Sequence, residues 1–245
     1  MDRQVYARMA ELEDRHWWFA ARRRILTEVL ARLVALPAAP RLLEAGCGTG
    51  GNLAMLSRFG EVAAFEPDAE ARRKAQEKSG FDVRDGRLPG DIPFEPGRFD
   101  LVAAFDVLEH VEDDVASLRA LHAQLRPGGA ALITVPAFEF LWSRHDERHH
   151  HWRRYTRAQL LRRASAAGFT PVVATCFNPL LFPLVAGIRL VKTVLRWRDS
   201  EDETLPPRVL NRVLTALFAS ERHLIGRVVL PVGVSLLMIA RKGDA

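Results

Sequence analysis

Short apolar runs alternate with amphipathic stretches between residues 41 and 140. The apolar runs are RLLEAG, EVAAFEP, FDVRD, FDLVAAFDV and AALITVPA, and the stretches between them are NLAMLSRF, DAEARRKAQEKS and DDVASLRALHAQL. Repeated runs of this kind predict β-α units on a parallel sheet. The runs are rich in Val, Leu, Ile and Ala and are bounded by Gly, Pro and Asp, as expected of strands buried on both faces.

The segments on either side of this core also carry periodic patterns. Residues 1–36 predict helix with an apolar stripe, and Pro37 ends the segment. After the core, TRAQLLRRASAAGF predicts a helix with Thr156 as N-cap and Gly168 as C-cap. PVVATCF (171–177) and VSLLMIARK (234–242) then predict two further strands. The stripe comprises Trp17, Trp18, Phe19, Ile25, Leu26, Val29, Leu30 and Leu33.

Composition narrows the class of protein. The chain has 245 residues, 48% of them hydrophobic, which suits one folded unit with a sizeable core. Its first residues lack the apolar segment of a signal peptide, and its two cysteines, Cys47 and Cys176, are too few for a disulfide framework. A cytoplasmic location is therefore expected. The formal net charge is +5, but without a long basic run or a nucleic-acid-binding motif we expect no nucleic-acid partner.

The stretch LLEAGCGTGGN (42–52) carries glycines at 46, 48 and 51, the G-x-G-x-x-G spacing of a dinucleotide-binding loop. Such a turn from a strand into a helix brings backbone N–H groups close to a ligand. Glu66 ends the next strand, where a carboxylate can accept hydrogen bonds from ribose hydroxyls. NAD and S-adenosylmethionine both carry that ribose, so these features alone leave the ligand open.

Four ordered motifs resemble class I S-adenosylmethionine-dependent methyltransferases. They are EAGCGTG (44–50), FDVRDG (81–86), FDLVAAFDVLEHVEDD (99–114) and LRPGGAALITVP (125–136). HWWFAARRR (16–24) and the D-x4-H-x-RRYT element starting at Asp146 are similar to a bacterial type 11/type 12-like subgroup. The resemblance implies a Rossmann-like, mostly parallel seven-stranded sheet with an antiparallel last strand, and S-adenosylmethionine as cofactor. It implies cofactor contacts from Glu44, Gly46, Cys47, Gly48, Gly50, Glu66, Pro67, Asp85, Gly86, Phe105, Asp106 and His110.

In the resembled fold the last two strands usually form a close pair, whereas here residues 178–233 separate them. This insertion contains two apolar stretches, 178–197 and 206–224, joined by the acidic DSEDE. Arg189 and Lys192 interrupt the first stretch, which is therefore too short to cross a bilayer; spanning takes about 20 mostly apolar residues. Two amphipathic helices are predicted, with three roles left open: packing on the core, a lid or apolar-acceptor channel, and a membrane or dimer contact through 178–224.

The whole chain is interpreted as one methyltransferase domain. It comprises an N-terminal helical segment (1–37), a cofactor-binding core (38–177), the insertion (178–233) and the final strand (234–242). The preferred activity is methyl transfer to a small-molecule, apolar or lipid-like acceptor, with the protein cytoplasmic or peripheral at the inner face of the membrane. An NAD(P)-dependent oxidoreductase and a non-catalytic cofactor-binding scaffold are the alternatives.

Catalytic candidates lie in SRHDERHHHWRRYT (143–156), which follows the fifth strand of the core. Histidine suits proton transfer near neutral pH. We expect His151 to act as base or substrate ligand, Asp146 to orient a histidine, and Tyr155 to contribute to catalysis. The alternative is that this segment is only a solvated polar loop. His145 and His149 would share a helix face, but no second ligand group has matching spacing, so no metal site is predicted.

Overall fold

The computed structural model describes residues 3–194 and 204–243. Its centre is a seven-stranded sheet in the order β3-β2-β1-β4-β5-β7-β6, in which β7 runs antiparallel to both neighbours and the other observed pairings are parallel. The mostly parallel α/β sheet with an antiparallel last strand is thus confirmed. The strands are β1 (Arg41–Ala45), β2 (Glu61–Phe65), β3 (Val83–Arg84), β4 (Phe99–Phe105), β5 (Leu125–Pro136), β6 (Thr170–Phe177) and β7 (Ser235–Arg241).

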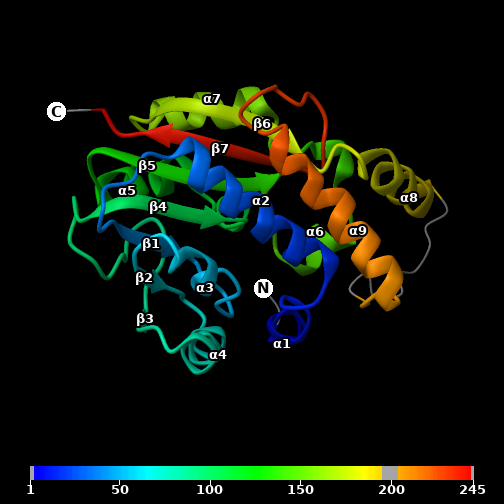
Figure 1. The fold of residues 1–245 in the computed structure, drawn as a ribbon, viewed down its shortest axis with the longest axis horizontal. Coiled ribbons are helices and arrows are strands. Elements are labelled where there is room, and N and C mark those ends of the chain that lie inside the picture. The colour runs from blue at the N-terminus through cyan, green and yellow to red at the C-terminus, as the bar shows by residue number, and fades with distance from the viewer. Residues whose placement is uncertain (1–2, 195–203, 244–245) are drawn as a thin grey trace.

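Helices cover both faces of the sheet (Figure 1). Leu121 of α5 and Leu160 of α7 pack in one core cluster, while Ile25 of α2 and Phe218 of α9 pack in another with Leu101 of β4. The helices are α1 (Arg3–Leu12), α2 (Trp17–Leu33), α3 (Leu53–Leu56), α4 (Ala69–Ser79), α5 (Asp114–Gln124), α6 (Arg144–Arg148), α7 (Arg157–Ala166), α8 (Phe182–Val194) and α9 (Arg208–Ser220), with 3-10 turns η1 (Leu108–His110), η2 (Glu139–Leu141) and η3 (Glu221–His223).

The predicted helical termini follow their local chemistry. Thr156 caps α7 by accepting a hydrogen bond from the Gln159 backbone, and the Gln159 side chain accepts one from the Thr156 backbone. Gly168, with φ +95°, follows the end of that helix in the left-handed region. The stretch NLAMLSRF forms only the four-residue α3. At Gly60 the chain then passes so close to the backbone of Pro40 that a Cβ would lie 2.2 Å from the carbonyl oxygen.

The insertion forms the two predicted helices, α8 and α9. Helix α9 lies along α2 on one face of the sheet (Figure 1). The end of the first predicted helix, residues 195–197, and the acidic DSEDE lie outside the described residues. Among residues 3–194 and 204–243, no helix is both long and apolar enough to cross a membrane.

Candidate active site

A cavity of about 1450 Å3 lies at the carboxyl ends of the parallel strands. The segments that follow β1, β2, β4 and β5 all contribute to its wall, as do α1, α2 and α8. In open α/β sheets this edge is where ligands bind, because the loops from several strands converge there. The cavity therefore marks the candidate active site.

The glycine loop after β1 forms one end of the cavity, where Glu44, Gly46, Cys47 and Gly48 line the wall. Gly48 has φ +55°, and a Cβ added there would meet nothing within 4 Å, so its backbone is open to a close ligand. Glu44 is buried, and the side-chain amide of Asn52 donates a hydrogen bond of 3.0 Å to one of its carboxyl oxygens. The other oxygen has no hydrogen-bond partner among the described residues. Burial raises the pKa of Glu44 to about 8.

Glu66, at the end of β2, is buried and lines the same end of the cavity beside Pro67. Its carboxylate accepts hydrogen bonds from the Gly48 backbone at 2.8 Å and the Asp68 backbone at 3.1 Å. The hydroxyl of Tyr6, on α1, donates to it at 3.3 Å. Burial raises the pKa of Glu66, and these backbone hydrogen bonds oppose the rise. A ligand hydroxyl can replace the Tyr6 hydroxyl as a hydrogen-bond donor to this carboxylate.

Three of the proposed cofactor residues lie away from the cavity wall. Asp85 is exposed and pairs with Arg72 at 3.1 Å, and Gly86 packs against Pro93. Gly50, with φ +84°, faces Ala75 of α4, where a Cβ would lie 3.0 Å from the alanine side chain. Gly50 thus allows α4 to pack closely. The residues after β3 that reach the cavity are instead Arg87, Leu88 and Pro89.

The end of β4 contributes Phe105 and Asp106 to the cavity. Asp106 adopts φ +55° and accepts a hydrogen bond from Thr134 at 3.0 Å. The buried guanidinium of Arg22, on α2, forms an ion pair with the same carboxylate. Arg22 also lies over the ring of Phe105, with its Cζ 5.6 Å from the ring centroid. The N-terminal helical segment therefore supplies a charged residue to the site.

The turn after β4 carries Glu109 and His110, and both line the cavity. Glu109 is fully buried, and neither carboxylate oxygen has a hydrogen-bond partner in the described part of the chain. Burial raises the pKa of Glu109 well above its usual value, and the nearby charge of Asp106 adds to the rise. Burial also lowers the pKa of His110 to about 3, with His151 close by, so His110 is neutral at neutral pH.

The segment after β5 brings His151 to this turn. His151 lines the cavity, and its ring centroid lies 4.6 Å from that of His110. Its Nδ1 lies 2.9 Å from Asp146, which is fully buried beneath it. Arg154 donates to both oxygens of Asp146, at 2.8 and 3.0 Å. The contact expected between Asp146 and a histidine is therefore present, and that histidine is His151.

Tyr155, the third catalytic candidate, is buried away from the cavity wall. Its hydroxyl donates to Asp114 at 2.8 Å and lies 3.2 Å from the Leu108 carbonyl. Burial raises the pKa of Tyr155, and the hydrogen bond to Asp114 adds to the rise. This geometry ties the segment containing His151 to the turn after β4 and offers no contact with a ligand in the cavity.

A family model described as methyltransferase domain matches residues 18–174. The chain belongs to this methyltransferase family. The predicted class I membership is thus confirmed. The methyltransferase is 36% identical over 147 residues to the ubiquinone biosynthesis O-methyltransferase of Methylocella silvestris, a match that covers 52% of the chain and 56% of the relative. It is 29% identical to the Azotobacter vinelandii protein of the same name, over 66% of the chain and 80% of that relative.

The chain thus spans little more than half of the first of these relatives. Among solved structures, it is similar to a complex of the Haloferax volcanii Trm112 methyltransferase activator with a methyltransferase, with TM-score 0.64 and 18% identity, covering 99% of this chain and 96% of that one. That likeness confirms the fold. Family membership decides against the oxidoreductase alternative that the glycine loop had left open.

Sequence reasoning missed Tyr6 and Arg22 of this methyltransferase as site residues. Arg22 shares a helix face with Trp18, Ile25 and Leu26, so an arginine on the apolar stripe of α2 was the available signal. Tyr6 carried no comparable signal. Cys47 contacts the cavity as predicted, but burial raises the pKa of its thiol, which makes a thiolate nucleophile unfavourable.

Proposed function

We propose that this methyltransferase transfers the methyl group of S-adenosylmethionine to an oxygen or nitrogen of a small apolar acceptor. A single observation carries the proposal: one cavity joins the glycine loop to the segment containing His151. Pockets for one drug-sized ligand usually measure about 300–1000 Å3. At about 1450 Å3, this cavity has room for a cofactor and an acceptor together.

The cofactor belongs at the glycine-loop end. The buried Glu44 oxygen without a partner offers a contact for the amino group of S-adenosylmethionine. The Glu66 carboxylate, which already accepts hydrogen bonds from the Gly48 and Asp68 backbone, can also accept from the ribose hydroxyls. The open backbone at Gly48 allows the close approach such a ligand needs. Phe105, Asp106 and Pro67 complete that end of the wall.

Bound there, S-adenosylmethionine supplies a methyl group already activated by its sulfonium. The protein contributes mainly by positioning the acceptor against the methyl group. Holding two reactants in the correct orientation lowers the activation barrier by about 7–11 kcal/mol. His151 lies on the acceptor side of this arrangement, and Asp146 fixes the ring through Nδ1. The position suits a base that takes the acceptor's proton or a group that binds the acceptor.

The apolar character of the acceptor rests on the rest of the wall. Trp17, Trp18 and Phe19 of α2 line the cavity together with Val185 and Ile188 of α8. Such a lining favours an apolar body that presents one polar group to His151. The two relatives named for ubiquinone biosynthesis are O-methyltransferases, which supports oxygen as the methylated atom.

The exposed face of helix α9 supports binding of the protein to a membrane surface. An apolar acceptor would then pass from the bilayer into the cavity. The exposed side of α9 includes Val209, Val213 and Leu217, with Arg208 and Arg212 beside them. Apolar side chains flanked by arginines bind the surface of an anionic bilayer, and a contact between two copies of the chain is the alternative.

Isothermal titration of the purified protein with S-adenosylmethionine, S-adenosylhomocysteine and NAD tests the cofactor. We expect binding of the two S-adenosyl compounds only. Labelled methyl transfer into an organic-soluble extract, compared with a water-soluble one, then tests the acceptor. Binding of NAD instead, or label in the water-soluble fraction alone, would refute the corresponding part of the proposal.

A further inference from the structure

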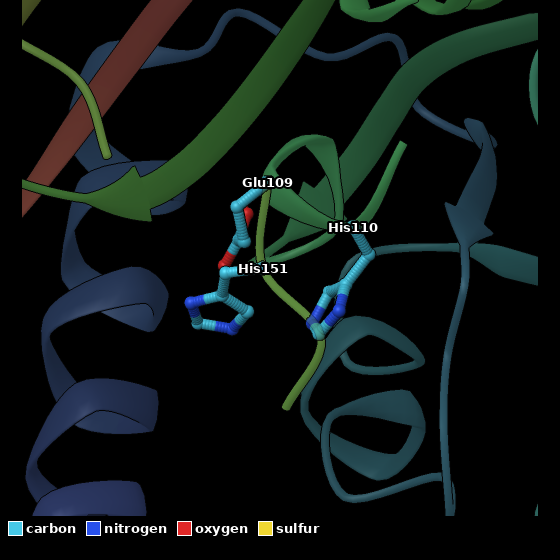
Figure 2. Close-up of side chains that lie close together, drawn as sticks. All are labelled: Glu109, His110 and His151. Carbon is cyan, nitrogen blue, oxygen red and sulfur yellow. The ribbon is translucent and has the colours of Figure 1, made fainter. Parts of the chain in front are cut away.

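Glu109, His110 and His151 form a cluster that the proposed function does not fully use. One ligand atom from each residue lies within 4.8 Å of the other two. Figure 2 shows the carboxylate and the two rings gathered in one space, with Glu109 and His110 from the turn after β4 and His151 from a separate segment. The Trp152 backbone donates to the Glu109 carbonyl at 2.7 Å and holds these segments together.

The most informative member is Glu109. A carboxylate excluded from water is costly unless a cation or hydrogen-bond donors compensate it. Glu109 is fully buried and lines the cavity, yet neither of its oxygens has a hydrogen-bond partner among the described residues. The side chain therefore lacks the compensation that a bound cation would provide.

The two histidines are oriented as metal ligands commonly are. His151 directs Nδ1 to Asp146 and leaves Nε2 as its remaining ring nitrogen. His110 makes a hydrogen bond with the backbone of His149 and likewise keeps one nitrogen. Histidines that bind metals usually donate their other N–H to a carboxylate or a backbone carbonyl, which fixes the ring.

We propose that Glu109, His110 and His151 bind one divalent transition-metal ion, such as Zn²⁺, Mn²⁺ or Co²⁺. Two imidazoles and one carboxylate are a common catalytic donor set, which leaves coordination positions for water or substrate. With bonds of about 2.1 Å in tetrahedral geometry, the ligand atoms on one ion lie about 3.4 Å apart. The three ligand atoms would therefore have to approach one another by up to about 1.4 Å from the 4.8 Å limit to close the site.

The surrounding charges permit a dication. The two guanidinium groups that act electrostatically on Glu109 belong to Arg22 and Arg154. Each is already paired with a carboxylate, Arg22 with Asp106 and Arg154 with Asp146. The Glu109 carboxyl itself has no ion-pair or hydrogen-bond partner among the described residues.

The role of the ion rests on the proposed function, whereas its binding does not. All three ligands line the cavity, so an open coordination position would face the acceptor. There the ion would bind an acceptor hydroxyl and lower its pKa. The hydroxyl proton leaves to solvent water, the oxygen bonds to the methyl carbon, and the electron pair of the broken C–S bond stays on sulfur. His151 then serves as a metal ligand, and the ion takes the place of the base that the proposed function assigns to His151.

Metal binding is measured on untagged, chelator-stripped protein by titration with Zn²⁺, Mn²⁺ and Co²⁺ and by elemental analysis. We expect one equivalent of at least one ion to bind the wild type, and Glu109→Gln and His151→Gln each to weaken binding at least 10-fold. His122→Gln is the matched control, because His122 packs against Phe169 outside the cavity wall and should leave binding unchanged. Circular dichroism and thermal unfolding confirm that each variant is folded.

Absence of binding to the folded wild type would overturn the proposal, as would full retention of binding in Glu109→Gln. Loss of binding in His149→Gln but not in Glu109→Gln would assign the ion to the neighbouring histidines instead. Titration of S-adenosylmethionine into the same His151→Gln protein separates the two proposals. Cofactor binding within about 3-fold of wild type alongside lost metal binding supports both, whereas metal binding without cofactor binding to the wild type would overturn only the proposed function.

Discussion

Replacing Asp146 with asparagine would disrupt a buried charge cluster beneath the proposed acceptor site. Asp146 is fully buried, accepts two hydrogen bonds from Arg154 at 2.8 and 3.0 Å, and lies 2.9 Å from Nδ1 of His151. It also accepts a hydrogen bond from the Ser143 backbone at 2.9 Å, which closes the capping box of α6. The asparagine side chain keeps the shape but leaves Arg154 without its counter-charge.

Removing one partner of a buried ion pair costs about 3–5 kcal/mol, because the other charge remains in a poorly solvated place. Arg154 is itself only 5% exposed, so the full range applies. We therefore expect Asp146→Asn to lower the free energy of unfolding in urea by about 3–5 kcal/mol. Glu77→Gln is the control: Glu77 pairs with Arg73 on the exposed side of α4, and such a pair is worth about 0.3–0.5 kcal/mol. A loss below about 1 kcal/mol for Asp146→Asn would refute the reasoning.

The pH dependence gives a second test of the same cluster. Burial alone would raise the pKa of Asp146, but the hydrogen bond with His151 and the charge of Arg154 lower it below its usual value. A depressed carboxyl pKa contributes stability above the unfolded value of about 3.9, and this contribution is lost as pH falls through the folded value. The difference in unfolding free energy between wild type and Asp146→Asn should therefore be full at neutral pH and shrink below about pH 4. A difference that grows on acidification would contradict this sign.

Four further variants test the rest of the molecule. Glu66→Gln should weaken S-adenosylmethionine binding about 10- to 100-fold in calorimetry, equivalent to roughly 1.5–3 kcal/mol for a charged hydrogen bond, whereas Asp85→Asn should change it less than 2-fold because Asp85 is exposed outside the cavity wall. Burial raises the pKa of Glu221 to about 7, so its contribution to stability is lost as pH rises through that value. The free energy of unfolding of Glu221→Gln in urea should therefore rise relative to that of wild type between pH 5 and pH 8. A difference between the two proteins that does not change with pH would contradict this. The double variant Val213→Glu, Leu217→Glu should reduce sedimentation with anionic vesicles at least 5-fold and leave binding of the cofactor unchanged; undiminished sedimentation would exclude α9 as the contact.

Periodicity predicted the individual strands, whereas the seven-stranded sheet with an antiparallel last strand followed from the family resemblance. Strands such as β4 and β5 are nearly continuous apolar runs because helices cover both faces, and that pattern is visible in the sequence without tertiary information. The lengths of the strands were less predictable. The third strand consists of Val83 and Arg84 alone, at the sheet edge, where only β2 pairs with it.

Local motifs predicted which residues gather at the glycine-loop end of the cavity better than which residues gather at its other end. Glu44 lies near the end of β1, Gly48 in the loop after it and Glu66 directly after the neighbouring strand β2, so their meeting follows from the order of the strands. Asp85 was placed by resemblance to a motif; in the structure it is exposed and pairs with Arg72. The alternation of strands and helices contains no information about that side-chain contact.

The cluster of Glu109, His110 and His151 shows why the remaining part of the site was not predictable from spacing. Glu109 and His110 are adjacent, but His151 comes from beyond β5, and metal motifs recognised in sequence require ligands at short fixed intervals. Here the interval is set by the fold: β4 and β5 are paired along their length, so the segments leaving their carboxyl ends meet. The hydrogen bond from Trp152 to Glu109 and the one from Tyr155 to Asp114 then fix that meeting point. Tyr155, expected to act in catalysis, thus has a structural reason to be present: it holds the segment that presents His151 to the cavity.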